Sequence, residues 1–306
     1  ASKITFKYSL DDGSQVNSTD TINFNVATGP HKIKVVAYDE AQNISNEINY
    51  SWMVGTTIPT VKYTQTPKPY DNQKGQFAFT GMDQFGDPLA KIECSLNGSA
   101  YATCNSPFVL VDLIQGSNSF KIRGTDNLGL MSGDLEYKWV YDTIAPVLTF
   151  ILNPAAFSNN VNEVSKVSVV EDGGLKYIEF FLDGVSLGQS LSDTAALNNL
   201  KEGPHTIQVV AQDMAGNNSV PINYYFYSDF TAPVVDPIWV NTPTGYTSIS
   251  IPVTAHDNIN AAANVLKYYY VLDDQVVYSL FNSPIMLTGL TNGLHNVKAY
   301  AVDQAG

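Results

Sequence analysis

Apolar and polar side chains alternate along most of this chain with a period of two residues. The pattern is clearest in two runs whose alternate residues are Ile33, Val35 and Ala37 in one and Ile207, Val209 and Ala211 in the other. A period of two is typical of β-strands that bury one face, because successive side chains of a strand point to opposite sides. The pattern therefore predicts an all-β chain.

The strands belong to a long internal repeat. A Gly, nine residues and an Asp recur at Gly29, Gly116, Gly203 and Gly293, which lie 87, 87 and 90 residues apart. Three prolines keep the 87-residue step, namely Pro59, Pro146 and Pro233. Proline cannot donate to a β-ladder and suits a link between domains. The period fits one small sandwich domain and is far longer than a solenoid repeat.

The repeat predicts tandem immunoglobulin-like β-sandwiches, arranged as beads on a string. The clearest repeat has seven strand-like runs, near 60–66, 76–82, 90–96, 99–103, 106–112, 118–125 and 134–141, as an immunoglobulin-like sandwich does. The predicted domains are repeat 1 (1–57, lacking its first strands), repeat 2 (58–144), repeat 3 (145–231) and repeat 4 (232–306, lacking its last strand). The segment is then either an excerpt of a longer array of such repeats or a subunit completed by strands from another molecule.

The last strand of each of the first three repeats carries large apolar side chains in the inward phase. These residues are Ile48, Tyr50 and Trp52, then Leu135, Tyr137 and Trp139, then Ile222, Tyr224 and Phe226. We expect them to be core residues rather than platforms for a ligand.

Composition narrows the classes of partner. Apolar residues make up 44% of the chain, which allows buried cores, and no apolar run approaches the roughly 20 residues of a membrane-spanning helix. Acidic residues outnumber basic ones, 29 to 16, and the net charge of −13 repels phosphate backbones and anionic membrane surfaces. We expect neither nucleic-acid binding nor membrane insertion.

Two segments resemble a known family. They are Gly203-Pro204-His205-Thr206-Ile207-Gln208-Val209-Val210-Ala211-Gln212-Asp213-Met214-Ala215-Gly216-Asn217, and Glu93-Cys94-Ser95-Leu96-Asn97-Gly98 with Cys104-Asn105-Ser106-Pro107. They resemble the bacterial immunoglobulin-like repeats of large secreted and cell-surface proteins, including adhesins. The resemblance implies an extracellular spacer, adhesive or accessory role, and it carries over no catalytic residue.

Cys94 and Cys104 are the only cysteines and flank the hairpin of repeat 2. Cys94 replaces an inward residue that is aromatic in the other repeats, and a bridge across the hairpin is sterically reasonable. We predict a disulfide, which implies an oxidising compartment such as the exterior or the periplasm. A zinc site is disfavoured because a second pair of ligands at the usual spacing is missing.

Three histidines share one place in the repeat, two residues after the marker glycine. They are His31, His205 and His295, and Asn118 takes their place in repeat 2. A role that Asn can take over indicates a hydrogen bond at the start of a strand rather than catalysis or metal binding.

Acidic residues recur in two loops at the end of the sandwich that meets the preceding domain. The candidates for a weak Ca²⁺ site are Asp83, Asp126, Asp172, Asp213, Asp257 and Asp303. Carboxylates gathered there could hold Ca²⁺ and stiffen the joint. We expect instead that each Asp accepts backbone N–H bonds in its own turn, and no cofactor is expected.

The outward face of one sheet differs between repeats. In repeat 2 it carries paired charges, whereas repeats 3 and 4 place Phe181, Val210, Tyr225, Tyr227, Tyr269 and Tyr300 there. Exposed aromatic patches often meet a partner, so any glycan or surface-protein site is expected on this face. The alternative is that these aromatics favour a pleated surface or pack against a neighbouring repeat.

These observations predict a non-catalytic spacer and adhesion segment of a bacterial protein at the cell surface or secreted. No zinc-protease helix motif, serine elbow or phosphate-binding glycine loop occurs in the sequence. Two alternatives stay open: an accessory region of a secreted polysaccharide-degrading enzyme, and a fibre subunit that assembles by strand exchange.

Overall fold

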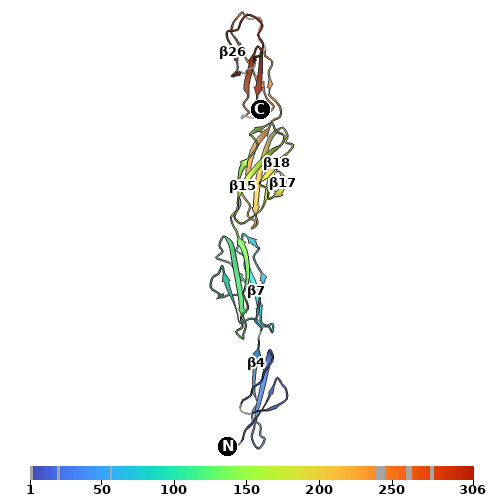
Figure 1. Ribbon diagram of the computed structural model, residues 1–306, viewed down its shortest axis with the longest axis vertical. Coiled ribbons are helices and arrows are strands. Elements are labelled where there is room, and N and C mark those ends of the chain that lie inside the picture. Colours follow the sequence, from blue (N-terminus) through green and yellow to red (C-terminus); the bar gives the residue numbers. More distant parts are fainter. Residues whose placement is uncertain (1–2, 19–20, 56, 239–244, 260–263, 276–278) are drawn as a thin grey trace. The chain divides into compact units, whose positions relative to one another are not determined.

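The computed structural model describes residues 3–18, 21–55, 57–238, 245–259, 264–275 and 279–306 (Figure 1). All regular structure in these residues is β-strand, numbered β1 to β27, and the predicted fold class of tandem immunoglobulin-like β-sandwiches is confirmed. No helix in this part of the chain is long and apolar enough to cross a membrane.

The chain divides into two compact units, Ala1–Asp142 and Thr143–Gly306. The names repeat 1 to repeat 4 are kept for the predicted segments. Every strand pairing of the described residues falls inside one of these segments, while the division into four domains stays a prediction.

Repeat 1 forms one antiparallel sheet with the strand order β2-β1-β3-β4. Its strands are β1 (Thr5–Leu10), β2 (Val16–Ser18), β3 (Gly29–Tyr38) and β4 (Ile48–Val54). The described residues of repeat 1 place no second sheet against it. The prediction that Ile48 and Tyr50 are buried is therefore wrong: they are 68% and 65% exposed, because one sheet alone leaves its apolar face uncovered.

Repeat 2 contains a three-stranded sheet, β10-β7-β5, and a five-stranded sheet, β6-β12-β11-β8-β9. The strands are β5 (Thr60–Gln65), β6 (Tyr70–Asp71), β7 (Gln76–Met82), β8 (Lys91–Leu96), β9 (Ala102–Thr103), β10 (Phe108–Val109), β11 (Gly116–Thr125) and β12 (Leu135–Tyr141). Each of the seven predicted strand-like runs contains a strand. The additional strand, β6, has two residues and pairs in parallel with β12.

Aromatic side chains fill the core between the two sheets of repeat 2. Phe77 and Phe120 are fully buried with ring centroids 4.4 Å apart, and Trp139 packs edge-on against Phe77 at 5.4 Å. The prediction that Trp139 is a core residue is confirmed. Complete burial of such a side chain contributes about 1.5–3 kcal/mol, so these aromatic residues stabilise the packing of the two sheets of repeat 2.

A buried tyrosine hydroxyl links the two sheets of repeat 2. Tyr63, on β5, lies 2.8 Å from the carbonyl oxygen of Phe120 and 3.0 Å from that of Leu135, which belong to the facing sheet. Burial raises the pKa of the Tyr63 hydroxyl. The hydroxyl therefore stays protonated and can donate to either carbonyl.

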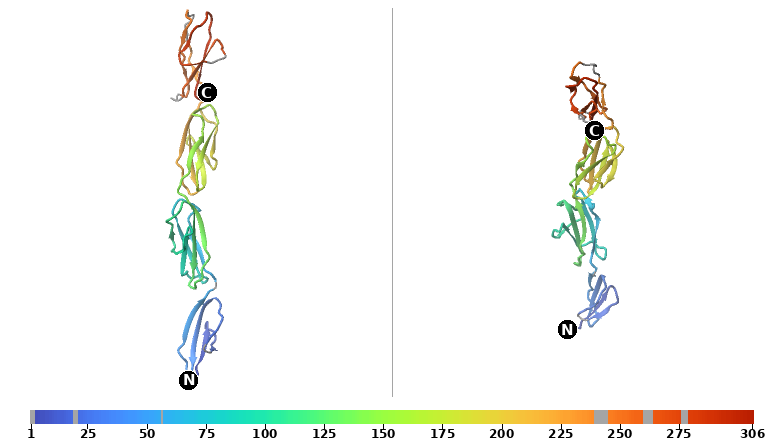
Figure 2. Two further views of the ribbon diagram at one scale, coloured as in Figure 1. Left: turned by 60° about the vertical axis from the view of Figure 1, so that its left-hand side comes forward. Right: turned by 45° about the horizontal axis from the view of Figure 1, so that its top comes forward.

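Repeat 3 has the same two-sheet plan, with the strand orders β13-β15-β18 and β14-β20-β19-β16-β17. The strands are β13 (Val147–Leu152), β14 (Phe157–Ser158), β15 (Glu163–Val170), β16 (Leu175–Leu182), β17 (Val185–Ser190), β18 (Thr194–Leu197), β19 (Gly203–Asp213) and β20 (Ile222–Ser228). Figure 2 shows these strands lying side by side along one direction. Ile207, Val209 and Ala211 are buried between the sheets, as the alternation predicts.

Repeat 4 contains the strand pairs β21-β23 and β22-β26 and the three-stranded sheet β25-β24-β27. The strands are β21 (Val234–Val235), β22 (Ile249–Ile251), β23 (Ala255–His256), β24 (Lys267–Leu272), β25 (Ser279–Phe281), β26 (Ile285–Leu287) and β27 (Val297–Val302). Its core is small: Ile251, Val253, Ile285 and Leu287 are buried. The tyrosines of β24, Tyr268 and Tyr270, pack against this core and are only partly buried.

The marker glycines share a backbone conformation that explains their recurrence. Gly29, Gly116, Gly203 and Gly293 have φ angles of 133°, 93°, 117° and 139°. A side chain at such φ values is strained, and glycine is not. Gly29, Gly116 and Gly203 begin the long strands β3, β11 and β19, and Gly293 precedes β27, so glycine marks the entry to the same strand of each repeat.

Candidate functional site

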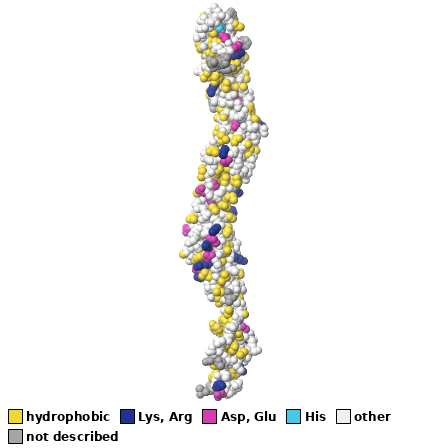
Figure 3. Space-filling view, viewed as in Figure 1, with side chains coloured by type: hydrophobic (Ala, Val, Ile, Leu, Met, Phe, Trp, Pro, Cys, Tyr) yellow, Lys and Arg dark blue, Asp and Glu magenta, His cyan; other side chains and the backbone are white. Residues whose placement is uncertain are grey.

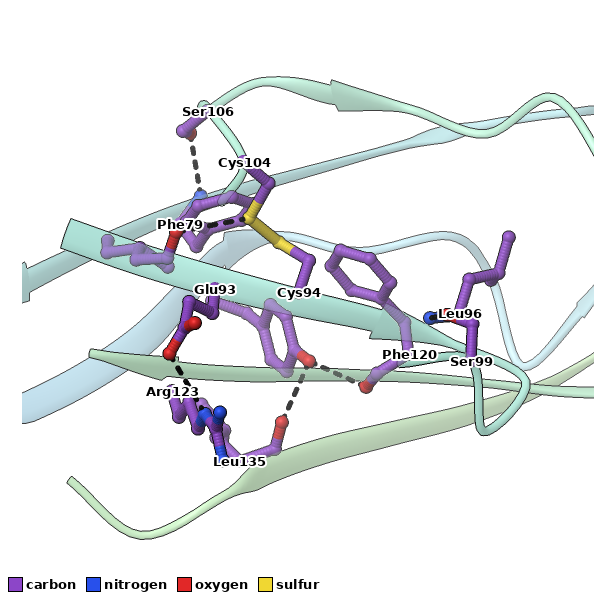
Figure 4. Close-up of a disulfide and its surroundings, with 12 residues drawn as sticks. Phe79, Glu93, Cys94, Leu96, Ser99, Cys104, Ser106, Phe120, Arg123 and Leu135 are labelled. Carbon is purple, nitrogen blue, oxygen red and sulfur yellow. Dashed lines mark hydrogen bonds and ion pairs between the residues drawn. A yellow bond between two sulfur atoms is a disulfide. The ribbon is translucent and has the colours of Figure 1, made fainter. Parts of the chain in front are cut away.

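A disulfide between Cys94 and Cys104 ties β8 to the segment that follows β9 (Figure 4). The two Cα atoms are 5.9 Å apart, and Cys94 is buried within the aromatic core of repeat 2. The backbone N–H of Cys104 donates to the carbonyl oxygen of Ile92, 3.1 Å away. The predicted disulfide is confirmed.

The outward face of the larger sheet in repeat 2 carries charges paired across strands, as the sequence predicts. Arg123 on β11 has its Nε 3.2 Å from Glu93 Oε2 on β8, and Lys121 on β11 has its Nζ 4.0 Å from Glu136 Oε1 on β12. Burial pushes the pKa of the Glu93 carboxyl up, but Lys91 and Arg123 outweigh it and hold that pKa below its ordinary value. Figure 3 shows acidic and basic side chains gathered next to one another over repeat 2. This face is a solvated surface of neutralised charges and not an apolar patch.

In repeat 3 the four candidate ligand-binding residues lie on neighbouring strands, with polar partners between them. Phe181 pairs with Gln208, Val210 with Glu179, and Tyr225 with Thr206. Tyr225 is 70% exposed. Tyr227 is half-buried because its ring stacks on that of Phe157, with centroids 5.2 Å apart. Tyr225 is therefore the member of this set that is most accessible to a partner.

In repeat 4 the candidate aromatics are direct neighbours. Tyr269 on β24 pairs with Tyr300 on β27 and, on its other side, with Leu280 on β25. Leu280 is 66% exposed, Tyr300 is 41% exposed and Tyr269 is half-buried. Side chains opposite one another on adjacent strands are about 5 Å apart, so these three residues form one continuous apolar row across the sheet.

The three repeated histidines all bind an aspartate and a backbone carbonyl. Nδ1 of each ring lies 2.7 Å from a carboxylate oxygen, in the pairs His31–Asp11, His205–Asp183 and His295–Asp273. Nε2 lies 2.7 or 2.8 Å from the carbonyl oxygen four residues earlier. The other oxygen of each Asp accepts the backbone N–H of the residue after the histidine, 2.8 Å away. The histidines are structural, as the sequence predicts.

Asn118 takes the histidine's place in repeat 2 by binding the same groups. Its Oδ1 accepts from Nδ2 of Asn97 at 2.8 Å, and its Nδ2 donates to the carbonyl oxygen of Ile114 at 2.7 Å. Asn97 Oδ1 accepts the N–H of Ser119, as the aspartates do in the other repeats. An amide pair therefore replaces the His–Asp pair of the other repeats.

Most of the aspartates considered for Ca²⁺ bind backbone N–H groups in their own turns. Asp126 Oδ1 accepts the N–H groups of Leu128 and Leu130 at 2.9 and 2.8 Å. Asp83 and Asp213 accept N–H groups two to four residues further along in the same way. Asp172 is exposed. Asp83, Asp126 and Asp213 therefore make the turn hydrogen bonds that we expect from the sequence, and Asp172 lies in solvent.

Asp257 and Asp303 come together with a third carboxylate that the sequence interpretation missed. Asp229, which follows β20, has a carboxylate oxygen within 4.8 Å of one from each of Asp257 and Asp303. A signal existed in the sequence: Asp229 precedes Pro233 by four residues, as Asp142 precedes Pro146, whereas Gly55 holds this place before Pro59. The sequence pattern predicts carboxylates in the loops after two strands, whereas Asp229 lies in the segment that leads into the link.

Neither a protein-family model nor a curated protein sequence matches the chain. Solved structures resemble it at low identity. The fibronectin(III)-like modules of CbhA from Clostridium thermocellum are 16% identical, with 55% of this chain and 94% of that chain covered and a TM-score of 0.32. Domains FN1–FN3 of chicken CNTN1 are 14% identical, with 81% of this chain and 94% of that chain covered and a TM-score of 0.31. Parabacteroides merdae β-glucuronidase is 12% identical, with 56% of this chain and 24% of that chain covered and a TM-score of 0.22.

Proposed function

We propose that this chain is a non-catalytic spacer segment with adhesive capacity, part of a bacterial protein that is secreted or displayed at the cell surface. The observation that carries the proposal is the covalent link inside repeat 2, in a chain built of immunoglobulin-like sandwiches. Disulfides persist in oxidising compartments and are rare where thiols are kept reduced. A disulfide that joins the sandwich core at Cys94 to the partly buried Cys104 therefore favours a location outside the cytoplasm.

The adhesive part of the proposal is supported by the aromatic row of repeat 4, Tyr269, Tyr300 and Leu280. Tyrosine presents a flat apolar face and a hydroxyl that can hydrogen-bond, which suits contacts with a glycan or a protein surface. The corresponding face of repeat 2 carries the Glu93–Arg123 ion pair instead. We therefore assign the binding face to repeat 4, together with Tyr225 of repeat 3, rather than to the whole chain equally.

A binding screen tests the adhesive proposal. The 306-residue chain is applied to a glycan array and to whole cells, beside the double variant Tyr269→Ser/Tyr300→Ser and the single variant Tyr225→Ser. Binding of the unaltered chain that the double variant loses supports the proposal. Tyr246→Ser is the matched control, since Tyr246 is 80% exposed and lies outside the strands. Absence of any binding, or equal binding by all variants, contradicts the adhesive role.

A thiol assay tests the proposed extracytoplasmic location independently of the binding screen. The protein is exported to the periplasm of a bacterial host in one culture and kept in the cytoplasm in another, and free thiols are counted after denaturation. We expect none in the exported protein and two in the cytoplasmic one. Free thiols in the exported chain would remove the main support for an extracytoplasmic location, whatever the outcome of the binding screen.

A further inference from the structure

Three carboxylates meet where repeat 3 passes into repeat 4. Asp229 follows β20, Asp257 follows β23 and Asp303 follows β27, and each offers a carboxylate oxygen within 4.8 Å of one from both others. Asp229 and Asp303 also line one hollow of about 200 Å³ in this part of the chain. Like charges held this close repel one another, so their juxtaposition has to be compensated.

Asp229 is the most deeply buried of the three carboxylates. It is 2% exposed, and neither of its carboxylate oxygens has a hydrogen-bond partner within the described residues. An ionised carboxylate removed from water without a partner is strongly destabilising. Asp257 and Asp303 place two further carboxylates beside Asp229. A bound cation would therefore compensate the negative charge of the Asp229 carboxylate.

The other two carboxylates are oriented by their turns, because one oxygen of each accepts backbone N–H groups there. Asp257 Oδ1 accepts the N–H of Ile259 at 2.7 Å, while its Oδ2 is buried and has no partner in the part of the chain that the structure describes. Asp303 Oδ1 accepts the N–H groups of Ala305 and Gly306 at 2.9 and 2.7 Å. The turn bonds fix the direction of both carboxylates before any ion arrives.

We propose that Asp229, Asp257 and Asp303 form a Ca²⁺ site at the joint between repeats 3 and 4. Ca²⁺ takes six to eight oxygen ligands, and three carboxylates with water supply them. The donor set has no His or Cys, which zinc prefers. Mg²⁺ requires a near-ideal octahedron and loses its water reluctantly, so a cluster of carboxylates from three loops favours the larger ion.

A hydrogen bond between repeats 3 and 4 lies next to this site, so a bound ion would act on the same joint. Asn258, next to Asp257, donates from Nδ2 to Glu202 Oε1 at 2.7 Å, and Glu202 Oε2 accepts the N–H of Phe230 at 3.0 Å. Glu202 and Asp229 belong to repeat 3, whereas Asp257 belongs to repeat 4. A bound Ca²⁺ would join the two repeats through charge at the point where the chain links them, and it would lower the freedom of the joint.

The experiment is a Ca²⁺ titration of the 306-residue chain by calorimetry at pH 7 after treatment with a chelator. An ionic strength of about 0.15 M screens diffuse attraction of cations to the acidic chain. We expect saturable binding of Ca²⁺ that weakens at least about tenfold in Asp229→Asn, because affinity follows the number of charged ligands. Asp193→Asn is the matched control: it removes the same charge from a half-exposed carboxylate of repeat 3 that pairs with Lys166, and this variant should bind as the unaltered chain does.

Thermal unfolding shows whether Asp229→Asn is folded, so that weaker Ca²⁺ binding by this variant is not confused with a failure to fold. Without Ca²⁺, Asp229→Asn should unfold at a higher temperature than the unaltered chain, because it removes one of three crowded carboxylates. Added Ca²⁺ should stabilise the unaltered chain and leave Asp229→Asn unchanged. Absence of saturable binding, or binding equal in Asp229→Asn, overturns the proposal. Stabilisation of the unaltered chain by acid but not by Ca²⁺ also overturns it, since a proton alone would then neutralise Asp229.

Discussion

His205 and Asp183 lie 22 positions apart in the sequence and are joined by a 2.7 Å contact between Nδ1 and Oδ2. Asp183 is at the turn after β16, with a φ of 52°, and His205 is near the start of β19. The pair fixes the end of the hairpin to the strand beside it. Its recurrence in repeats 1 and 4, and its replacement by two amides in repeat 2, indicate that the hydrogen-bond pattern matters more than the residues that make it.

The replacement can be tested by exchanging one pair for the other in repeat 2. Asn118→His alone places a ring N–H against the Nδ2 donor of Asn97, and we expect a loss of about 1–2 kcal/mol in stability. Adding Asn97→Asp supplies a carboxylate and should recover at least half of that loss. Aspartate tolerates the φ of 51° at this position, as Asp183 does.

Native-state hydrogen exchange of the amides of β11 measures this coupling, since it reports on repeat 2 separately. The two single variants and the double variant form a double-mutant cycle. Additive losses would show that the amide pair and the His–Asp pair are not equivalent.

The His–Asp pairs should also give the chain a pH dependence. In repeat 1 both ring nitrogens of His31 face acceptors, Asp11 Oδ2 and the carbonyl oxygen of Ala27. The ring can donate to both acceptors only when both nitrogens carry hydrogen, so these contacts favour its positively charged form. The hydrogen bond that His31 donates to Asp11, followed by the one it donates to Ala27, raises the pKa of His31 above its ordinary 6.5. Accepting the bond from His31 lowers the pKa of the Asp11 carboxyl below its ordinary 3.8.

The signs of these shifts define a pH window. Stabilisation by His31 is complete below about pH 6.5, the unfolded pKa, and disappears as the pH rises through the raised pKa of the folded state. Stabilisation by Asp11 is complete above its unfolded pKa of about 3.8 and disappears as the pH falls through the lowered value. The pair should therefore stabilise repeat 1 most between these two limits.

Titration of the histidine ring resonances by NMR checks this expectation. We expect the pKa of His31 to fall in Asp11→Asn. The pKa of His295 should stay raised in the same variant, since its partners are the carbonyl of Thr291 and Asp273. An unchanged pKa of His31 would mean that Asp11 does not hold the charge.

The strands and the pairing of Cys94 with Cys104 could be predicted because both follow from local patterns. Alternation, marker glycines and turn residues are properties of neighbouring residues and recur in every repeat. The exposure of Tyr50 could not be predicted in this way. Its phase is that of a core residue, but burial needs an opposing sheet, and the described part of repeat 1 supplies only one sheet.

The grouping of Asp229 with Asp257 and Asp303 was also beyond the sequence patterns. Each Asp sits in a turn or link that explains it locally, and only the fold brings three such places together. The distinguishing property of Asp229 is its burial: it is 2% exposed, and among the described residues its carboxylate oxygens have no hydrogen bond comparable to those that Asp126 and Asp213 accept in their turns. Sequence patterns show which aspartates can accept N–H groups in a turn, but not which of them the fold buries next to other carboxylates.

Removal of the disulfide should weaken repeat 2 without abolishing its fold. The bridge closes a short loop, since the cysteines are ten positions apart, and a loop of this length contributes about 2–3 kcal/mol by restricting the unfolded chain. The aromatic core around Phe77 and Phe120 remains. Cys94→Ala/Cys104→Ala should therefore unfold in less urea than the unaltered chain. A midpoint equal to that of the oxidised protein would contradict this expectation.

A methyl group at a marker glycine should destabilise its repeat. Gly203 has a φ of 117° and no atom within 4 Å of an added Cβ, so the cost of Gly203→Ala is conformational rather than steric. We expect about 1 kcal/mol or more. Gly133→Ala is the control, because an added Cβ there also meets nothing and its φ is not in the positive range. Thermal unfolding of both variants measures the difference, and equal effects would show that φ is not the reason for the conserved spacing of the glycines within this chain.

The link between the two sheets of repeat 2 through Tyr63 gives a last prediction. Tyr63→Phe keeps the ring, which packs on Phe77 with centroids 5.1 Å apart, and removes only the hydroxyl. The carbonyls of Phe120 and Leu135 then lose a buried donor, and a loss of about 1–2 kcal/mol is expected. Tyr225→Phe removes a hydroxyl from a side chain that is 70% exposed and should have little effect. Urea unfolding of the two variants measures the contrast. If both changes were neutral, water would have to replace the Tyr63 hydroxyl between the sheets, and aromatic packing alone would hold the two layers of repeat 2 together.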